Sequence, residues 1–283
     1  MKSLQKSLLE EYCFWEGRLT AFDKSKFSDF ISTEEVLKGY YILIDYFLSQ
    51  GETLSYGIKD FTLIGSAVGR QFTAWRGKSK WTDKYQIAAT LFFGINKNHA
   101  FSDGNKRTSM LILLYYLVKN NFTVVNEFKN NFERLALRTA ANELDKYPCY
   151  EKYKKSSDSD IFTIAHIIKK SVRKMDKSYA PMTFQEFFSK LRNYGFEYEL
   201  SGGYVDIFKK QKRLFSTKNK KVIQIGCPGL KRQINVKAAK SVLKACELTD
   251  ENGYDFRTFL EGNESMYKII SDFEAPLRRL KDN

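Results

Sequence analysis

Two neighbouring segments of this 283-residue chain carry apolar side chains on nearly every face, and they limit the possible folds more than any other feature. They span residues 83–97 and 104–120, and their length favours helices over strands. A helix that is apolar all round has to be buried on all sides. We therefore expect a mainly α-helical fold built around these two segments.

Helical patterns continue on both sides of this pair. Ser32 or Thr33 can serve as the N-cap of a helix, and Glu35 follows three residues after Ser32 to complete a capping box. Further helices are expected over residues 130–144 and 159–175. The sequence thus predicts a helical domain over residues 1–178, with its core at 30–150.

A second pattern begins after Pro181, where polar residues indicate a domain boundary. A helix is expected over 183–194, followed by a strand, a Gly-Gly turn and a strand over 196–210. A third strand near 220–229 and an amphipathic helix over 236–248 complete the order. We predict a multidomain protein whose second domain, residues 182–283, is a small α+β unit.

The charge is uneven along the chain. Residues 151–283 hold 27 Lys and Arg against 17 Asp and Glu, whereas residues 1–150 hold 20 against 16. A basic domain is suited to RNA or another polyanion, although a solvated basic surface explains the charge equally well. The candidate RNA-binding residues surround the end of the expected hairpin: Lys209, Lys210, Lys212, Arg213, Lys220 and Lys221.

The sequence does not favour a membrane or an exported protein. Its longest apolar run, residues 110–118, is too short for a bilayer, which takes about 20 residues. The N-terminus lacks the continuous apolar segment of a signal peptide. Four scattered cysteines without CxxC spacing predict free thiols rather than disulfides or a zinc site. We expect a cytoplasmic protein with no membrane partner.

Residues 55–82 are interrupted by glycines and are expected to form a short helix followed by an irregular loop that combines positive charge with aromatic residues. Loops of this kind often carry function. One interpretation is a flap on which a target protein docks, and the other is a surface loop without a role. The cations of the candidate flap are Arg70, Arg76, Lys78 and Lys80.

Between the two apolar segments lies "NHAFSDGNKRTS", residues 98–109, which concentrates polar chemistry at the junction of buried elements. The first N–H groups of the following helix favour an anion, and Gly104 lets the backbone approach a phosphate. Asn105, Lys106 and Arg107 add donors and charge. Asp103 can hold a divalent ion, and His99 can act as general base near neutral pH. Phe101 is expected to anchor the loop in the core.

The stretch "HAFSDGNKRTS" resembles the active-site signature of the Fic/Doc (Fido) family, and more closely that of the death-on-curing (Doc) branch. The resemblance covers about residues 30–150. It implies an enzyme that uses ATP and Mg²⁺ to modify a hydroxyl side chain of a protein, with His99 as base, Asp103 at the metal and residues 104–107 at the phosphates.

Within this family the resemblance leaves two reactions open. Most Fic proteins transfer AMP, whereas Doc transfers the terminal phosphoryl group to elongation factor Tu. Lys106 stands where AMP-transferring members usually have Gly, and Met110 stands where they usually have a second Arg. Both departures favour a kinase-like phosphotransferase, with nucleotidyl transfer as the alternative.

The same resemblance implies a toxin or phage-defence effector, restrained by an antitoxin or inhibitor protein. The inhibitory Fic signature is not matched cleanly, because "TFLEGN" at residues 258–263 is one residue short. The second half is similar to the small HicA-type toxins of dsRBD-like fold, but the catalytic histidine of those toxins is replaced by Gly203 and Tyr204. A further alternative is therefore an RNA- or ribosome-binding regulatory protein with a non-catalytic Fic-like pocket.

Overall fold

The computed structural model describes residues 4–25, 27, 29–174, 182–213, 216–248 and 264–281. The chain divides into two compact units. Unit 1 consists of Met1–Met175 together with Asn263–Asn283, and unit 2 consists of Asp176–Gly262. Each unit has its own cluster of buried apolar residues.

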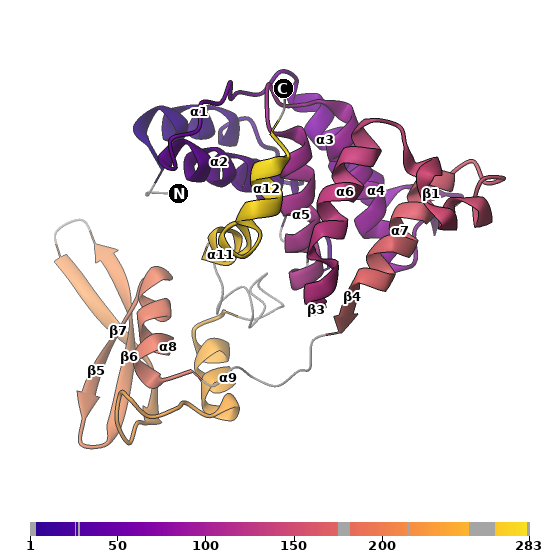
Figure 1. Cartoon of the computed structure of the whole chain (residues 1–283). Helices are drawn as coiled ribbons and strands as arrows, with labels where there is room; N and C mark the ends of the chain where they lie inside the picture. The colour runs from indigo at the N-terminus through magenta and orange to yellow at the C-terminus, as the bar shows by residue number, and fades with distance from the viewer. Residues whose placement is uncertain are drawn as a thin grey trace. The chain divides into compact units, whose positions relative to one another are not determined.

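Unit 1 is a helical assembly with α4 and α5 at its centre (Figure 1). Both helices are buried along most of their length, as the apolar pattern predicts. Around them pack helices from before and after this pair in the sequence. The helices of unit 1 are α1 (Lys6–Glu16), α2 (Thr33–Ser49), α3 (Phe61–Gly69), α4 (Lys84–Asn98), α5 (Asn105–Lys119), α6 (Lys129–Ala140), α7 (Ser159–Ser171), α11 (Glu264–Asp272) and α12 (Glu274–Arg279).

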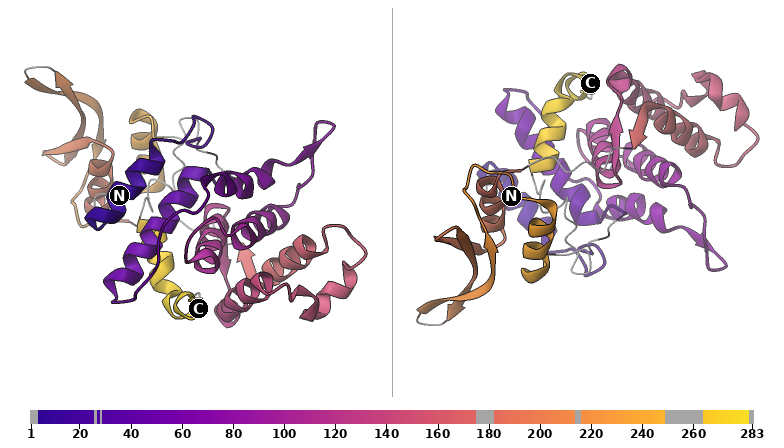
Figure 2. Two further views of the ribbon diagram at one scale, coloured as in Figure 1. Left: turned by 90° about the horizontal axis from the view of Figure 1, so that it is seen from above. Right: turned by 90° about the horizontal axis from the view of Figure 1, so that it is seen from below.

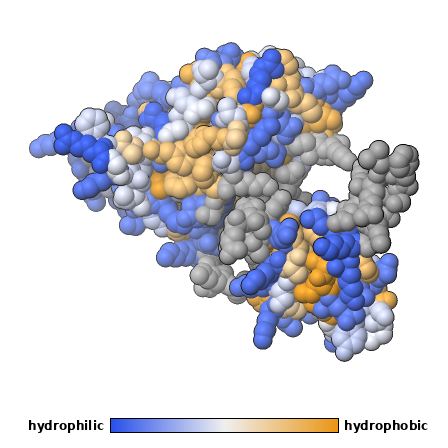
Figure 3. All heavy atoms as spheres, turned by 180° about the vertical axis from the view of Figure 1, so that it is seen from behind, coloured by the Kyte–Doolittle hydropathy of each residue, from blue (hydrophilic) through white to orange (hydrophobic). Residues whose placement is uncertain are grey.

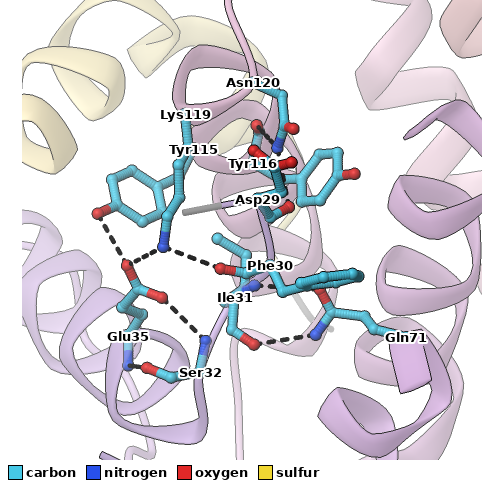
Figure 4. Close-up of polar contacts among 10 residues, drawn as sticks. All are labelled: Asp29, Phe30, Ile31, Ser32, Glu35, Gln71, Tyr115, Tyr116, Lys119 and Asn120. Atoms are coloured by element: carbon cyan, nitrogen blue, oxygen red, sulfur yellow. Dashed lines mark hydrogen bonds and ion pairs between the residues drawn. The ribbon is translucent and has the colours of Figure 1, made fainter. Parts of the chain in front are cut away.

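The start of α2 is joined to the end of α5 by a polar network (Figure 4). Ser32 and Glu35 form the expected capping box. The Lys119 ammonium, 7% exposed, bonds the Glu35 carboxylate at 2.7 Å and the Phe30 carbonyl at 2.8 Å. On the other side of this segment, the Gln71 side chain accepts from the Ile31 N–H and donates to the Ile31 carbonyl. This network fixes the end of α5 that is remote from the 98–109 stretch.

Short antiparallel pairs and 3₁₀ turns connect the helices. The pairs are β1 (Ala74–Trp75) with β2 (Lys78–Ser79), and β3 (Phe122–Val124) with β4 (Val172–Lys174). The helix expected over 159–175 ends at Ser171, because the chain then extends to pair with β3. The 3₁₀ turns are η1 (Arg70–Phe72), η2 (Asn126–Phe128), η3 (Leu144–Lys146) and η4 (Pro148–Lys152).

The C-terminal helices belong to unit 1, whereas the sequence analysis assigned all of 182–283 to the second domain. The reason is their apolar face, which packs on α2, α5 and α6. Two further views show these yellow helices against the other helices of the unit (Figure 2). Their buried residues are Met266, Ile269, Ile270, Phe273, Leu277 and Leu280.

Unit 2 has the order helix, three strands, helix that the sequence predicts. Its elements are α8 (Phe184–Asn193), β5 (Phe196–Ser201), β6 (Tyr204–Arg213), β7 (Ser216–Gly226) and α9 (Val236–Ala245). The strands form an antiparallel sheet in the order β5-β6-β7. Its core brings Phe187 and Phe188 of α8 and Val242 of α9 together with Val205 and Ile207 of β6.

Part of the surface of unit 1 is aromatic. The rings of Phe22, Phe27, Phe30 and Phe72 contact one another, and Phe22 is 56% exposed. Figure 3 shows apolar residues gathered into a continuous area on one face of the molecule. Among the described residues, no helix has both the length and the apolar character required to cross a membrane.

Candidate active site

His99 lies at the surface, at the end of α4. It is the C-cap of this helix and adopts a left-handed backbone with φ 52° and ψ 42°. Such a conformation is uncommon for a residue with a Cβ. It turns the chain from α4 into the loop that precedes α5, and it leaves the imidazole exposed. The candidate base is therefore accessible to a substrate.

The loop after His99 is fixed by backbone pairing with residues 57–60. The N–H groups of Lys59 and Asp60 donate to the Ala100 carbonyl at 2.8 and 3.3 Å. The Ser102 N–H donates to the Gly57 carbonyl at 2.9 Å, and Ile58 and Phe101 form an isolated antiparallel bridge. Residues 57–60 thus lie directly beside the motif loop, which the sequence analysis did not foresee.

The Phe101 side chain lies in the core beneath the loop. Its fully buried ring stacks on Tyr40 of α2 with centroids 4.0 Å apart and an angle of 12° between the planes. The Tyr40 hydroxyl accepts from the Gly57 N–H at 2.8 Å and donates to the Gly57 carbonyl. Burial raises the pKa of Tyr40, and the carboxylates of Glu11 and Asp103 raise it further. Tyr40 therefore stays neutral and holds both chain segments.

Asn105 closes the loop from within. Its Oδ1 accepts from the Phe101 N–H at 3.1 Å, and its Nδ2 donates to the Phe101 carbonyl at 2.9 Å. The residue is 4% exposed. The sequence analysis assigned the Asn105 side chain to phosphate, but both of its polar atoms are engaged in the loop. What it contributes is the shape of the turn.

Asp103, Gly104 and Lys106 surround the first turn of α5. Asp103 is 9% exposed, and Lys106 is half-buried. Gly104 is the N-cap with φ 81°, and a Cβ added there would meet no atom closer than 3.7 Å. Glycine is therefore required by the backbone angle and not by lack of space. The first N–H groups of any helix lack intrahelical partners, so this turn can receive an anion.

Arg107 faces away from that turn. Its side chain is 1% exposed and donates from Nε to the Leu277 carbonyl and from Nη2 to the Arg278 carbonyl. It also pairs with Glu52 at 2.9 Å. The phosphate role expected for Arg107 therefore finds no support in the geometry.

The β1–β2 hairpin lies at the other end of α4 from His99. Since a helix rises about 1.5 Å per residue, the 15 residues of α4 span roughly 20 Å between the chain that follows the hairpin and His99. Arg70 packs on Phe93 and donates to Thr90, and burial lowers its pKa. Lys80 pairs with Asp158 at 2.7 Å. Arg76, Lys78 and Lys80 of the candidate flap are exposed, but their place before α4 in the chain does not favour docking beside His99.

Asp103 is the carboxylate of the loop that could hold a metal ion. Among the described residues there is no group of three or more His, Cys, Asp or Glu side chains that could hold an ion. Mg²⁺ commonly uses one or two carboxylates with phosphate oxygens and water, so a single aspartate fits it. Glu11 of α1 also lies near the loop, with Oε1 3.5 Å from the position of a Cβ at Gly57. No sequence signal connects α1 to the motif.

The basic residues of unit 2 are only partly described. The side chains of Lys210, Lys212 and Arg213 lie outside the described residues. Lys209 is 3.9 Å from Glu247, and Lys221 is 2.7 Å from Asp206. Carboxylates therefore offset part of the positive charge expected at the β6–β7 hairpin.

Residues 30–117 match the family model of the Fic/DOC family. This stretch includes α2, α3, α4 and most of α5, with the whole motif loop between the last two. The match supports the Fic/Doc assignment for this part of unit 1, and it indicates transferase activity of the Fic type in general. Neither the comparison with curated proteins nor the comparison with solved structures gave a match.

Proposed function

We propose that unit 1 transfers the terminal phosphoryl group of ATP to a hydroxyl side chain of a target protein. The observation that carries this proposal is the exposed His99 on a loop whose other residues are fixed and which leads into the first turn of α5. The target hydroxyl attacks the γ-phosphorus, its proton goes to His99, and the bond to ADP breaks. Positioning and charge neutralisation supply most of the catalysis in such transfers.

Each remaining part of the site has one task in this proposal. A Mg²⁺ ion, when bound, would neutralise phosphate charge, and Asp103 would hold it. The first N–H groups of α5 and the Lys106 side chain bind phosphate oxygens. Phe101, Tyr40 and Asn105 keep the loop rigid.

Phosphoryl transfer is favoured over AMP transfer by two positions. Lys106 is the residue found in Doc, and AMP-transferring members usually have Gly there. Met110, where they usually have a second Arg, is fully buried in the core, so it offers no contact to an outer phosphate. We extend the proposal to a toxin or phage-defence effector that modifies a translation factor such as elongation factor Tu and is restrained by an antitoxin or inhibitor, on the Doc resemblance alone.

The test is incubation with cell lysate, Mg²⁺ and ATP labelled in parallel on the α- and the γ-phosphate. We expect label from the γ position only, with loss in His99→Ala and retention in His166→Ala. The second variant is a matched control because the chain has just two histidines. Label from the α position would replace the kinase proposal by AMP transfer, and no transfer from either position would contradict both.

A second candidate function is RNA binding by unit 2, and the observation that favours it is a basic stripe on α9. Lys237, Lys240 and Lys244 are exposed on one helical face, with Lys231 and Arg232 just before the helix. Within the described part of the chain, none of these five pairs with a carboxylate, in contrast to Lys209 and Lys221. Unpaired cations spaced along a helix suit a phosphate backbone.

This candidate is tested by fluorescence anisotropy of a labelled RNA duplex over a range of salt concentrations. Changing Lys237, Lys240 and Lys244 to Gln is expected to lower the salt slope of the affinity by about 3, or roughly 1 per phosphate contact. The matched control changes Lys209, Lys220 and Lys221 to Gln. A larger loss in the control would move the contact to the hairpin, and salt-independent or absent binding would refute the candidate.

A further inference from the structure

Arg107 is a motif residue whose side chain is directed into the protein. All but 1% of it is buried, and its Cζ lies 4.3 Å from the centre of the Phe47 ring. Phosphate binding would require its donors to reach solvent. Instead Nε and Nη2 bond protein groups, and Nη1 is buried with no hydrogen-bond partner in the part of the chain that the structure describes.

The partners of Arg107 come from a distant part of the sequence. The Leu277 and Arg278 carbonyls accept at 2.9 and 3.0 Å, about 170 residues further along the chain. They belong to the last turn of α12, where a cation is favourable. The Leu277 carbonyl also accepts from the Leu280 N–H at 3.2 Å, so Arg107 adds a second donor to it. Arg107 therefore caps α12 from the first turn of α5, and Figure 1 shows α12 beside α5.

Glu52 completes this connection. One of its oxygens bonds Arg107 at 2.9 Å, and the other lies 3.3 Å from Arg278. Its side chain is 11% exposed. A buried guanidinium without an opposite charge is costly, so Glu52 is needed to keep Arg107 in place. The three residues join the segment after α2, the start of α5 and the end of α12.

We infer that Arg107 is a positioning residue that fixes the first turn of α5 to the C-terminal segment, and that residues 264–280 are therefore part of the machinery that shapes the phosphate site. This inference rests on the proposed function for its effect on ATP. The capping of α12 itself does not depend on that function. Glu52 acts through Arg107, because a carboxylate cannot bind a phosphate directly.

The test compares Arg107→Lys and Glu52→Gln in the full chain. Hydrogen exchange of peptides covering residues 264–280 is measured first, since it requires no activity. Both variants are expected to speed this exchange about tenfold. Lysine cannot reach the Leu277 and Arg278 carbonyls and Glu52 together as the planar guanidinium does, and Gln at position 52 leaves that guanidinium without an opposite charge. Arg279 of α12 also forms a charged pair, at its more exposed end, with Glu133 of α6. Arg279→Gln breaks this pair, serves as the control and is expected to change the exchange less.

ATP affinity is measured in the same variants. We expect each substitution to lower the affinity for ATP. The double variant should bind ATP no more weakly than the weaker-binding single variant, because the two residues act as one unit. The inference is overturned if Arg107→Lys weakens ATP binding while exchange over 264–280 stays unchanged, or if Glu52→Gln alters neither. Absence of ATP binding by the wild type would refute the proposed function, and the exchange result would still decide the capping role.

Discussion

At the scale of single residues, the motif loop depends on two positions with positive φ, His99 and Gly104. They act at opposite ends of the loop. His99 ends α4 and remains exposed, while Gly104 begins α5 and is buried. The backbone between them is held by Tyr40, Asn105 and residues 57–60, so the imidazole projects from a hydrogen-bonded segment of backbone.

Replacing Gly104 shows whether the glycine is required by its backbone angle or by the space around it. Gly104→Ala is expected to lower the free energy of unfolding by about 1–2 kcal/mol, because the left-handed conformation is costly for a residue with a Cβ. Gly104→Asn should cost less, since asparagine tolerates this region. Denaturant unfolding measures both variants. Equal losses for Ala and Asn would mean that contact with the core, and not the backbone angle, requires glycine.

His166 gives unit 1 a pH dependence. Burial on α7, with the positive charges of Lys170, Lys152 and Lys169, lowers its pKa, and Tyr153 bonds Nδ1. The unfolded chain therefore takes up a proton that the folded chain does not. The resulting stability is present above the unfolded pKa of about 6.5 and is lost as the pH falls through the lower folded value.

The measurement is thermal unfolding between about pH 7.5 and about pH 5.5. The melting temperature of His166→Gln is expected to fall less over this range than that of the wild type. His99→Gln serves as the control, because His99 is exposed. If the melting temperatures of the wild type and His166→Gln changed equally with pH, the pH dependence could not be assigned to His166.

At the scale of elements, the β1–β2 hairpin is exposed along both strands, with Trp75 75% exposed. Since it lies at the far end of α4, changing Arg76 and Lys78 to Ser is expected to leave label transfer by His99 within about twofold of the wild type. Lys59→Ser, in the segment that pairs with the motif loop, is the comparison variant. A large rise in KM for the hairpin variant would restore the docking-flap hypothesis.

Elements with local signals could be predicted from the sequence, and those with distant partners could not. The signals for the capping box at Ser32 and Glu35 lie in neighbouring residues. The same is true of the two apolar helices. The turn of Arg107 toward Leu277 depends on residues 170 positions apart. The same holds for Val172–Lys174, which continues a helical pattern and becomes a strand only because Phe122–Val124 lies beside it.

At the scale of the whole molecule, unit 1 is built from two stretches of chain with unit 2 between them. Truncation after Gly262 is expected to destabilise unit 1 by several kcal/mol, since burying one large apolar side chain contributes roughly 1.5–3 kcal/mol and at least Ile270, Phe273 and Leu277 would be lost. The core of unit 2 includes none of the residues described after Leu248 and should remain intact.

Hydrogen exchange resolved by peptide tests this prediction. Protection should fall in α2, α5 and α6 and persist in β5, β6 and α8. The opposite result would support the boundary that the sequence analysis drew, in which all residues after 182 form one domain. Full-length chain under the same conditions provides the reference.

The division of unit 1 also sets an order of events on the ribosome. Domains generally fold as they emerge, N-terminal parts first, but Arg107 and Glu52 receive their final partners only after residues 277 and 278 have been synthesised. Unit 2 is complete in the sequence before that point, and it can fold while unit 1 is still open. A nascent chain would thus carry a finished basic unit before it has a finished transferase, so the timing of synthesis itself delays the appearance of activity.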